Sequence, residues 1–323
     1  MRSMNHQKFA LLALISLLLA TACRTAGSST TILPTATTPG DVAVAATLPP
    51  AIAATNTPIP PTPTPTEPLA AVVNGEQIFL SEFEAELARY NTQQGGAGAE
   101  TPGYRDQVLN ALIERRLIMQ AATAEGVDIT PEMVDERLAE LQSAGDAGAF
   151  QTFLQTNGWT EDEFRETLTA ELVTSEMIAR VTAGVPTTME QVRASYIQMD
   201  DATLAQTVLE RAQAGDDFAF LAEQNSVDRL TGVNGGDLGF FKIGSLLVPE
   251  VEAAAFALQP GEISNLITVT GEDGKTTYYI IQVTERDPNR ELTTDDRYGL
   301  MQATFDAWLE NLWAKAAIER FIQ

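Results

Sequence analysis

Ten of the sixteen prolines in this chain lie between residues 34 and 68, mixed with threonine and alanine. Proline fixes φ and lacks a backbone N–H, so a segment this rich in it forms neither helices nor the interior of a sheet. It also carries too little apolar surface to form a core, and such compositions favour extended, polyproline II conformations. We therefore expect residues 24–68 to be a disordered linker. At about 3 Å per extended residue, it spans on the order of 100 Å.

The segment before the linker has the layout of a secretory signal. Arg2 and Lys8 precede an uncharged, apolar stretch at residues 9–22, which ends in small residues. Fourteen residues are too few to span a bilayer comfortably. We expect residues 1–22 to be a signal peptide that is removed on export.

The signal ends in Leu-Leu-Leu-Ala-Thr-Ala-Cys, which resembles a bacterial lipobox. In that motif the chain is cut before the cysteine, which then carries a lipid. The resemblance implies that Cys23 is the lipidated N-terminus and anchors the protein to a membrane on the extracytoplasmic side. Ala20 stands where the motif usually has leucine, and an ordinary signal peptide with Cys23 as a bystander remains the alternative.

Charge and residue usage exclude several classes of function. The chain has 323 residues, about two domains, with 20 Lys and Arg against 44 Asp and Glu, a formal charge of -24. Such a surface repels nucleic acid. The one cysteine and the one histidine, His6, lie in or beside the signal. We therefore expect no metal site, no disulfide, no thiol–imidazole catalysis and no cofactor.

Residues 69–190 show the spacing of a helical domain. Asn74 and Gly75 predict a short strand or hairpin at residues 71–79, and Ser81 is positioned to cap the helix that follows. Thr130 before Pro131 marks another helix start, and Thr160 with Glu163 predicts a capping box. Apolar residues recur at helical spacing through these segments.

An apolar stripe follows at the C-terminal end, at spacings of three and four residues: Tyr298, Met301, Phe305, Trp308 and Leu312. It predicts one helix of about thirty residues at 293–323. We expect this face to pack on the helical domain. Packing on the middle of the chain, or exposure as a surface that binds unfolded proteins, are the alternatives.

Residues 191–288 predict a small α/β domain. The expected order is strand, two helices, strand, helix and two strands, with Asp217 or its neighbour Asp216 capping the second helix and Asp273-Gly274 forming a hairpin. The run Gly-Gly-Asp-Leu-Gly-Phe-Phe at residues 235–241 contains three glycines that permit tight turns.

This run and residues 248–264, Val-Pro-Glu-Val-Glu-Ala-Ala-Ala-Phe-Ala-Leu-Gln-Pro-Gly-Glu-Ile-Ser, resemble the parvulin type of peptidyl-prolyl isomerase domain. With the lipobox and the flanking helices, the whole chain resembles exported foldase lipoproteins of the PrsA and SurA type. The resemblance implies an α+β fold: a helical SurA-N-like chaperone domain, a parvulin-type domain with a mostly antiparallel four-stranded sheet, and a long C-terminal helix.

The resemblance also assigns a site. Isomerisation of an X-Pro bond breaks no covalent bond and requires a site that binds the twisted amide better than the planar forms. The apolar proline pocket of the family falls on Leu238, Phe241, Leu247 and Val251. The acidic position falls on Asp228 and a hydroxyl on Thr276. Leu247 and Val251 as ordinary core residues, and Asp228 as a loop residue, are the alternative interpretations.

Two histidines of the family are replaced together, by Tyr196 and Tyr279. A tyrosine keeps a ring and a hydrogen-bonding hydroxyl, which is neutral near pH 7 because its ordinary pKa is about 10. We therefore expect the two tyrosines to keep a hydrogen-bonded pair under the sheet. The resemblance implies that the family's histidines orient the site and tune Asp228, so we expect a weakened isomerase activity, with complete loss of activity as the alternative.

The leading hypothesis is a membrane-tethered prolyl isomerase that assists the folding of unfolded or nascent exported polypeptides with X-Pro bonds. The alternative is a non-catalytic holdase in which a degenerate parvulin domain serves as a peptide-binding module. A lipoprotein with one particular partner is a third hypothesis, for which no motif is found.

Overall fold

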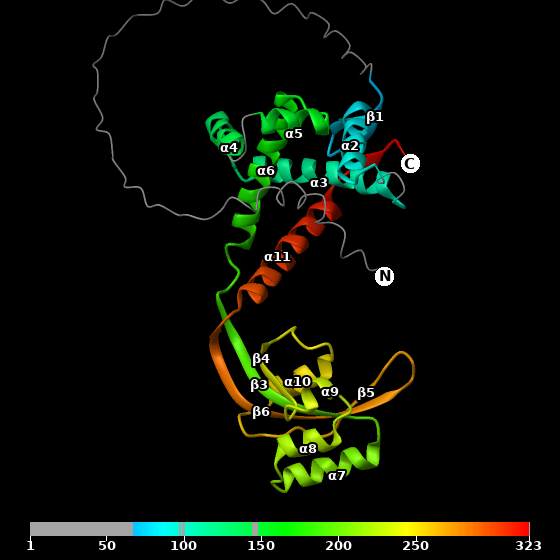
Figure 1. Ribbon diagram of the computed structural model, residues 1–323, viewed down its shortest axis with the longest axis vertical. Coiled ribbons are helices and arrows are strands. Elements are labelled where there is room, and N and C mark those ends of the chain that lie inside the picture. The colour runs from blue at the N-terminus through cyan, green and yellow to red at the C-terminus, as the bar shows by residue number, and fades with distance from the viewer. Residues whose placement is uncertain (1–66, 97, 99–100, 144–147, 323) are drawn as a thin grey trace, which may run out of the picture. The chain divides into compact units, whose positions relative to one another are not determined.

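The computed structural model describes residues 67–96, 98, 101–143 and 148–322 (Figure 1). The predicted signal segment, Cys23 and residues 24–66 of the predicted linker lie outside them. The chain divides into two compact units. The first comprises the part up to Arg180 together with Trp308–Gln323, and the second is Val181–Ala307.

The first unit begins with a hairpin and continues as a series of helices. In order these are β1 (Leu69–Val73), β2 (Glu76–Phe79), α2 (Leu80–Gln93), α3 (Tyr104–Ala124), α4 (Pro131–Ser143), α5 (Ala149–Asn157) and α6 (Glu161–Thr182). Asn74 and Gly75 both adopt positive φ, 52° and 88°, which confirms the predicted turn.

Two helix caps predicted from the sequence differ in their outcome. Glu163 accepts from the backbone N–H of Thr160 at 2.9 Å and donates its own N–H to the Thr160 hydroxyl at 3.2 Å, so the predicted capping box is confirmed. The prediction for Ser81 was wrong. The helix already begins at Leu80, and the Ser81 hydroxyl donates to Glu67 instead of a helix N–H.

The C-terminal segment also differs from its prediction. Helix α11 (Thr294–Lys315) is shorter than the thirty residues expected, and strand β7 (Ile318–Arg320) follows it. β7 pairs antiparallel with the free edge of β1, giving a three-stranded sheet of order β2-β1-β7. The hydrogen bonds offered by this edge determine the conformation of the last residues. Leu312, Trp313 and Ile318 pack against the core of the first unit, whereas Tyr298 is 63% exposed.

The second unit contains a four-stranded sheet with helices on both faces. Its elements are β3 (Thr188–Met199), α7 (Ala202–Gln213), α8 (Phe218–Asn225), α9 (Arg229–Gly232), β4 (Asp237–Lys242), α10 (Pro249–Ala257), β5 (Ile267–Thr270) and β6 (Thr276–Glu291). The strand order is β4-β3-β6-β5 and each neighbouring pair is antiparallel. The predicted α+β fold with an antiparallel four-stranded sheet is therefore confirmed.

The two faces of this sheet bury different side chains, because successive residues of a strand point to opposite sides. Ile197 and Ile280 pack with α7 and α8 in one core cluster. Ala194, Tyr279 and Ile281 pack with α10 in the other. Figure 1 shows α7 and α8 on one side of the sheet and α10 on the opposite side. Tyr279 therefore faces α10.

Candidate functional site

The two tyrosines that replace the family histidines lie side by side on the α10 face of the sheet. Tyr196 on β3 is opposite Ile281, and Tyr279 on β6 is opposite Gln198, so the two are diagonal neighbours on adjacent strands. Their rings stack with centroids 6.0 Å apart and an angle of 25° between the planes. The strand register thus brings together two residues that are 83 positions apart in the sequence.

Asp228 completes this group from the N-terminus of α9. The Tyr196 hydroxyl donates a hydrogen bond to Oδ2 of Asp228, and the Thr231 hydroxyl donates to the same oxygen at 2.6 Å. Oδ1 accepts from the backbone N–H of Leu230 at 2.9 Å, which makes Asp228 the N-cap of α9. The carboxylate is held by donors on two elements. The expected hydrogen-bonded pair of tyrosines is not formed between these two described residues: their rings stack, and the Tyr196 hydroxyl donates to Asp228 instead.

Thr231 was not predicted from the sequence. The available signal was its position three residues after an aspartate that caps a helix, from which a hydroxyl can donate to the capping carboxylate.

These contacts determine the charge of the site. Hydrogen bonds from Thr231 and then Tyr196 hold the pKa of Asp228 below its ordinary value of 3.8. Burial, followed by the hydrogen bond to Asp228, raises the pKa of Tyr196 to about 12. Burial, followed by the Asp228 charge, also raises the pKa of Tyr279. At neutral pH the site therefore consists of one carboxylate anion and two neutral hydroxyls.

The glycine turn before β4 allows its backbone to approach β3 closely. Gly236 accepts a hydrogen bond from the Tyr196 N–H at 3.0 Å, and a Cβ at Gly236 would lie 2.1 Å from the Tyr196 carbonyl oxygen. The next residue, Asp237, accepts from the Gly239 N–H and forms an ion pair with Arg193 at 2.8 Å. Asp237 thus has a structural role in the turn, and Gly236 fixes the position of Tyr196.

Three of the four predicted pocket residues gather in the apolar cluster on this face. Phe241 and Val251 are 6% and 3% exposed, and Leu238 is partly buried against the same cluster, which also contains both site tyrosines. Leu247 does not join them, because its side chain is 100% exposed. The preceding residue, Leu246, packs against the cluster in its place.

Thr276 is not brought to the carboxylate by any contact of the described residues. It lies at the start of β6, where its hydroxyl shares a hydrogen bond of 3.3 Å with Thr270 across the hairpin.

The segment that carries Leu247 is held by a residue that was not predicted, Glu252. Its carboxylate accepts hydrogen bonds from the backbone N–H groups of Gly244, Ser245 and Leu246, at 2.9, 2.9 and 3.0 Å. Burial opposes ionisation of Glu252, but these three N–H groups and Lys242 outweigh it, so the pKa lies below 4.5. An acidic residue in the first turn of a helix just after a glycine-containing loop was the available signal.

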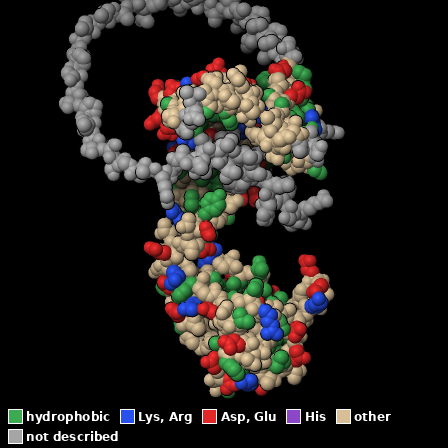
Figure 2. Space-filling view, in the orientation of Figure 1, with side chains coloured by type: hydrophobic (Ala, Val, Ile, Leu, Met, Phe, Trp, Pro, Cys, Tyr) green, Lys and Arg blue, Asp and Glu red, His purple; other side chains and the backbone are tan. Residues whose placement is uncertain are grey.

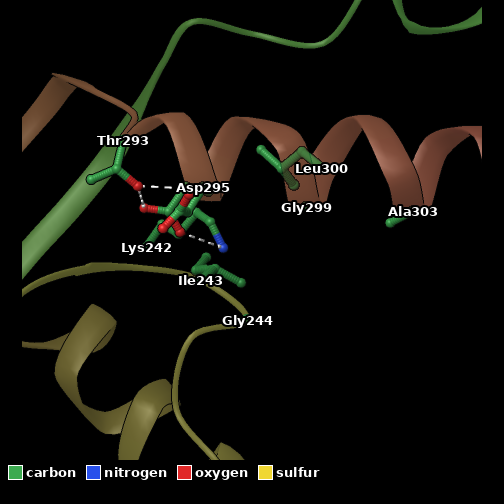
Figure 3. A pocket seen from close by; sticks show the side chains of 9 residues that line it. Lys242, Ile243, Gly244, Thr293, Asp295, Gly299, Leu300 and Ala303 are labelled. Carbon is green, nitrogen blue, oxygen red and sulfur yellow. Dashed lines mark hydrogen bonds and ion pairs between the residues drawn. The ribbon is translucent and has the colours of Figure 1, made fainter. Parts of the chain in front are cut away.

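A hollow in the second unit lies between the segment after β4 and the first turns of α11 (Figure 3). It encloses about 610 Å³ and is lined by Lys242, Ile243, Gly244, Thr293, Asp295, Asp296, Gly299, Leu300 and Ala303. Lys242 Nζ forms an ion pair with Asp296 at 3.4 Å, and the Thr293 hydroxyl donates to Asp296 at 2.7 Å. None of the predicted site residues lines this hollow. The candidate functional site is therefore the hydrogen-bonded group around Asp228.

Among the described residues, no helix has both the length and the apolar character needed to cross a membrane. Figure 2 shows acidic side chains on the visible face of both units, in keeping with the net charge.

The fold and the site define a chain with a helical SurA-like region and a parvulin-type domain. The family described as SurA-like N-terminal domain matches residues 59–178, and the family described as PPIC-type PPIASE domain matches residues 190–285. The second match contains Tyr196, Asp228, Gly236 and Tyr279.

Several curated relatives are named foldase protein PrsA. Foldase protein PrsA of Halalkalibacterium halodurans is 33% identical over 207 residues, which are 58% of this chain and 60% of that protein. Foldase protein PrsA of Streptococcus gordonii is 31% identical over 252 residues, 74% of this chain and 76% of that protein. A crystal structure of peptidylprolyl isomerase (PrsA) from Bacillus cereus covers 76% of this chain and 89% of its own, at 24% identity and a TM-score of 0.44.

The chain belongs to the PrsA foldase family. The resemblance identified from the sequence is thereby confirmed. The match spans about 60% of the length of the H. halodurans relative.

Proposed function

We propose that this protein is a peptidyl-prolyl cis-trans isomerase that acts as a foldase on exported polypeptides. The observation that carries the proposal is the carboxylate of Asp228, held by Tyr196 and Thr231 beside an apolar cluster that contains Phe241 and Val251. Family membership supports a foldase with a rotamase domain over the non-catalytic holdase.

The chemistry requires only a charge and an apolar surface. A planar amide places partial negative charge on its oxygen through resonance, and rotation about the C–N bond removes that resonance. A fixed anion near the carbonyl therefore disfavours the planar form more than the twisted form. Asp228 supplies this anion, and the apolar cluster accommodates the proline ring. No proton transfer is needed, so the absence of imidazole at positions 196 and 279 does not prevent the reaction.

The two tyrosines act through Asp228. Tyr196 donates to the carboxylate and fixes its direction, and Tyr279 supports the Tyr196 ring by stacking. The hydrogen bond from the Tyr196 hydroxyl stabilises the Asp228 carboxylate and draws part of its negative charge toward the hydroxyl proton. We therefore expect a modest catalytic rate.

A protease-free assay tests this function. The cis–trans exchange rate of a short X-Pro peptide is measured by NMR with and without the full chain. We expect acceleration by the wild type and a loss of at least about tenfold for Asp228→Ala and Asp228→Asn, since Asn keeps the cap but removes the charge. Asp217→Asn is the matched control, because Asp217 is the N-cap of α8 and accepts from the Phe220 N–H at 2.8 Å. No acceleration by the wild type would reject the enzymatic function.

The cellular setting is part of the same proposal. The signal-like residues 1–22 and the lipobox support export and lipidation at Cys23, with residues 24–68 as a tether and the folded part on the extracytoplasmic side. Fractionation of cells that express Cys23→Ser tests it. Release of this variant from the membrane, with retention of the wild type, supports the anchor, and equal retention of both contradicts it.

A further inference from the structure

Most X-Pro bonds of this chain lie in its own predicted linker. Ten of the sixteen prolines fall between residues 34 and 68, and nine of these precede Glu67, the first described residue. The prolines of the folded units are held in trans, since the described residues contain no cis peptide bond. In unfolded polypeptides, by contrast, an X-Pro bond is cis in about 10–30% of molecules and exchanges slowly. The predicted linker therefore offers substrates to a prolyl isomerase.

The inner end of this segment is attached to the first unit. The Ser81 hydroxyl donates to the Glu67 carboxylate. The Leu80 N–H donates to the Pro68 carbonyl at 2.9 Å. Pro34 precedes Glu67 by 33 residues, a reach on the order of 100 Å at about 3.1 Å per extended residue. Because a compact unit of this size is about 35 Å across, the outer prolines can reach any exposed surface of either unit.

The composition of the segment suits the candidate site. The chain carries 44 acidic against 20 basic residues, and Asp228 is an anion at neutral pH, so acidic polypeptides are repelled. Between Arg24 and Glu67, Asp41 is the one charged residue of the sequence. The apolar cluster that contains Phe241 lies beside the carboxylate and accommodates a proline ring. An almost uncharged, proline-rich segment therefore fits both the charge and the apolar surface of the site.

Attachment to the same chain raises the local concentration of the segment. A flexible tether of this length gives an effective concentration on the order of 1 mM at a site within its reach. In a solution of about 10 µM protein, this is about a hundredfold above the concentration of sites that a free peptide encounters. The linker bonds therefore meet the Asp228 carboxylate much more often than the same bonds in a separate peptide.

We propose that the Asp228 site binds and isomerises the X-Pro bonds of residues 33–65 of its own chain. The proposal rests on the proposed isomerase function and adds an intramolecular substrate to it. Rotation about the C–N bond breaks no covalent bond, so no co-reactant is needed. Without an exported polypeptide the site acts on its own linker, and an exported polypeptide competes with the linker for the site.

Exchange spectroscopy of the full chain, labelled with 13C at proline, tests the proposal directly. We expect the cis and trans signals of the linker prolines to exchange at least about tenfold faster than those of a free peptide of residues 33–66 added at the same concentration. Asp228→Asn should abolish this difference, and Asp217→Asn, which changes the N-cap of α8, should keep it. The rate should not change between about 10 and 100 µM protein, because the encounter is intramolecular. A rate proportional to protein concentration assigns the exchange to a second copy and overturns the proposal.

The same measurement separates this proposal from the isomerase function. If the wild type accelerates an added Ala-Pro peptide while its linker prolines exchange at the rate of the Asp228→Asn variant, the intramolecular substrate is rejected and the isomerase function stands. If neither is accelerated, both are rejected.

A second measurement follows occupancy of the site without catalysis. All nine prolines of residues 34–65 are replaced by alanine, and the backbone amide shifts of α9 are compared with those of the wild type. We expect these shifts to change and the catalytic efficiency toward the added peptide to rise about twofold, the factor for an effective concentration equal to the dissociation constant. Thr57→Ser with Thr62→Ser and Thr64→Ser, which keeps every proline, is the matched control. Identical shifts and efficiency in the alanine variant and the wild type overturn the proposal.

Discussion

At the scale of single residues, the exchange of imidazole for phenol changes how this site responds to pH. A histidine pair titrates near neutrality, whereas Tyr196 has a pKa of about 12 and stays a neutral donor. The only group of the hydrogen-bonded site that changes charge below neutrality is Asp228, whose pKa lies below 3.8.

We expect the isomerase activity to be constant between about pH 5 and 8, because Asp228 is ionised and both tyrosines are neutral throughout. The double variant Tyr196→His with Tyr279→His should introduce an inflection near the histidine pKa of about 6.5. NMR exchange rates across this range provide the measurement. An inflection near neutrality in the wild type would contradict the role of Asp228 as the single titrating group.

Tyr196 also makes stability sensitive to alkali. Its folded pKa, about 12, is raised above the ordinary value of 10.0, so the folded state holds the proton more tightly. This stabilisation is complete below pH 10 and is lost as pH rises through the folded pKa. We expect the free energy of unfolding to fall above pH 10 in the wild type and to fall less in Tyr196→Phe. Urea unfolding at a series of alkaline pH values checks this, and parallel pH profiles for the two proteins would refute it.

At the scale of elements, the segment between β4 and α10 depends on one carboxylate. Glu252 accepts three backbone N–H groups of residues 244–246, which support the position of Leu246 on the apolar cluster. A loop that carries pocket residues is therefore tied to the first turn of α10.

We expect Glu252→Ala to lower the free energy of unfolding of the second unit by about 2 kcal/mol, since three N–H groups lose a charged acceptor. The apparent KM for X-Pro peptides should rise as the segment loosens. Glu250→Ala on the same helix is the control, because Glu250 is exposed. Urea unfolding followed by far-UV circular dichroism measures the effect, and equal losses in both variants would show that only helix charge matters.

Two glycines, Gly236 just before β4 and Gly239 within β4, give a second matched pair. Gly236 has φ +74° and its Cβ position overlaps the backbone of Tyr196, whereas Gly239 has φ +66° and open space around it. Gly236→Ala should cost several kcal/mol and displace Tyr196, while Gly239→Ala should cost about 1 kcal/mol from backbone strain alone. Thermal unfolding ranks the two variants, and similar melting temperatures would disprove the close approach.

At the scale of the whole molecule, the first unit is completed by residues from the other end of the chain. β7 pairs with β1, and the Phe321 N–H donates to the Ala70 carbonyl at 3.0 Å. Ile318 and Ile322 pack against the same core. The second unit is therefore inserted between two segments that fold together.

Removal of residues 317–323 should lower the free energy of unfolding of the first unit by about 2–4 kcal/mol, because backbone hydrogen bonds and apolar cover are lost together. All three tryptophans, Trp159, Trp308 and Trp313, belong to this unit, so tryptophan fluorescence reports it selectively. Glu319→Ala, an exposed position of β7, is the control. An unchanged fluorescence transition in the truncated chain would show that β7 contributes nothing to stability.

The sequence by itself determined the order of elements in the second unit, apart from the one-turn helix α9, and the residues of the central group. The β-rich runs of β3 and β6, the Gly-Gly-Asp turn and the capping box at Thr160 are local patterns, and a local pattern is readable because the interacting residues are a few positions apart. The family motifs then placed Asp228, Tyr196 and Tyr279 in one site, and the strand register brings them together.

Only the tertiary structure decided which side chains of a loop are buried. Leu246 and Leu247 are adjacent leucines with the same transfer free energy, yet one packs on the cluster and the other is fully exposed, because Glu252 holds the backbone N–H groups of residues 244–246. Likewise, the last residues form a strand because β1, more than two hundred residues earlier in the chain, offers them an open edge. Propensity and spacing act over a few residues, whereas burial and edge pairing depend on elements that meet only when the chain has folded.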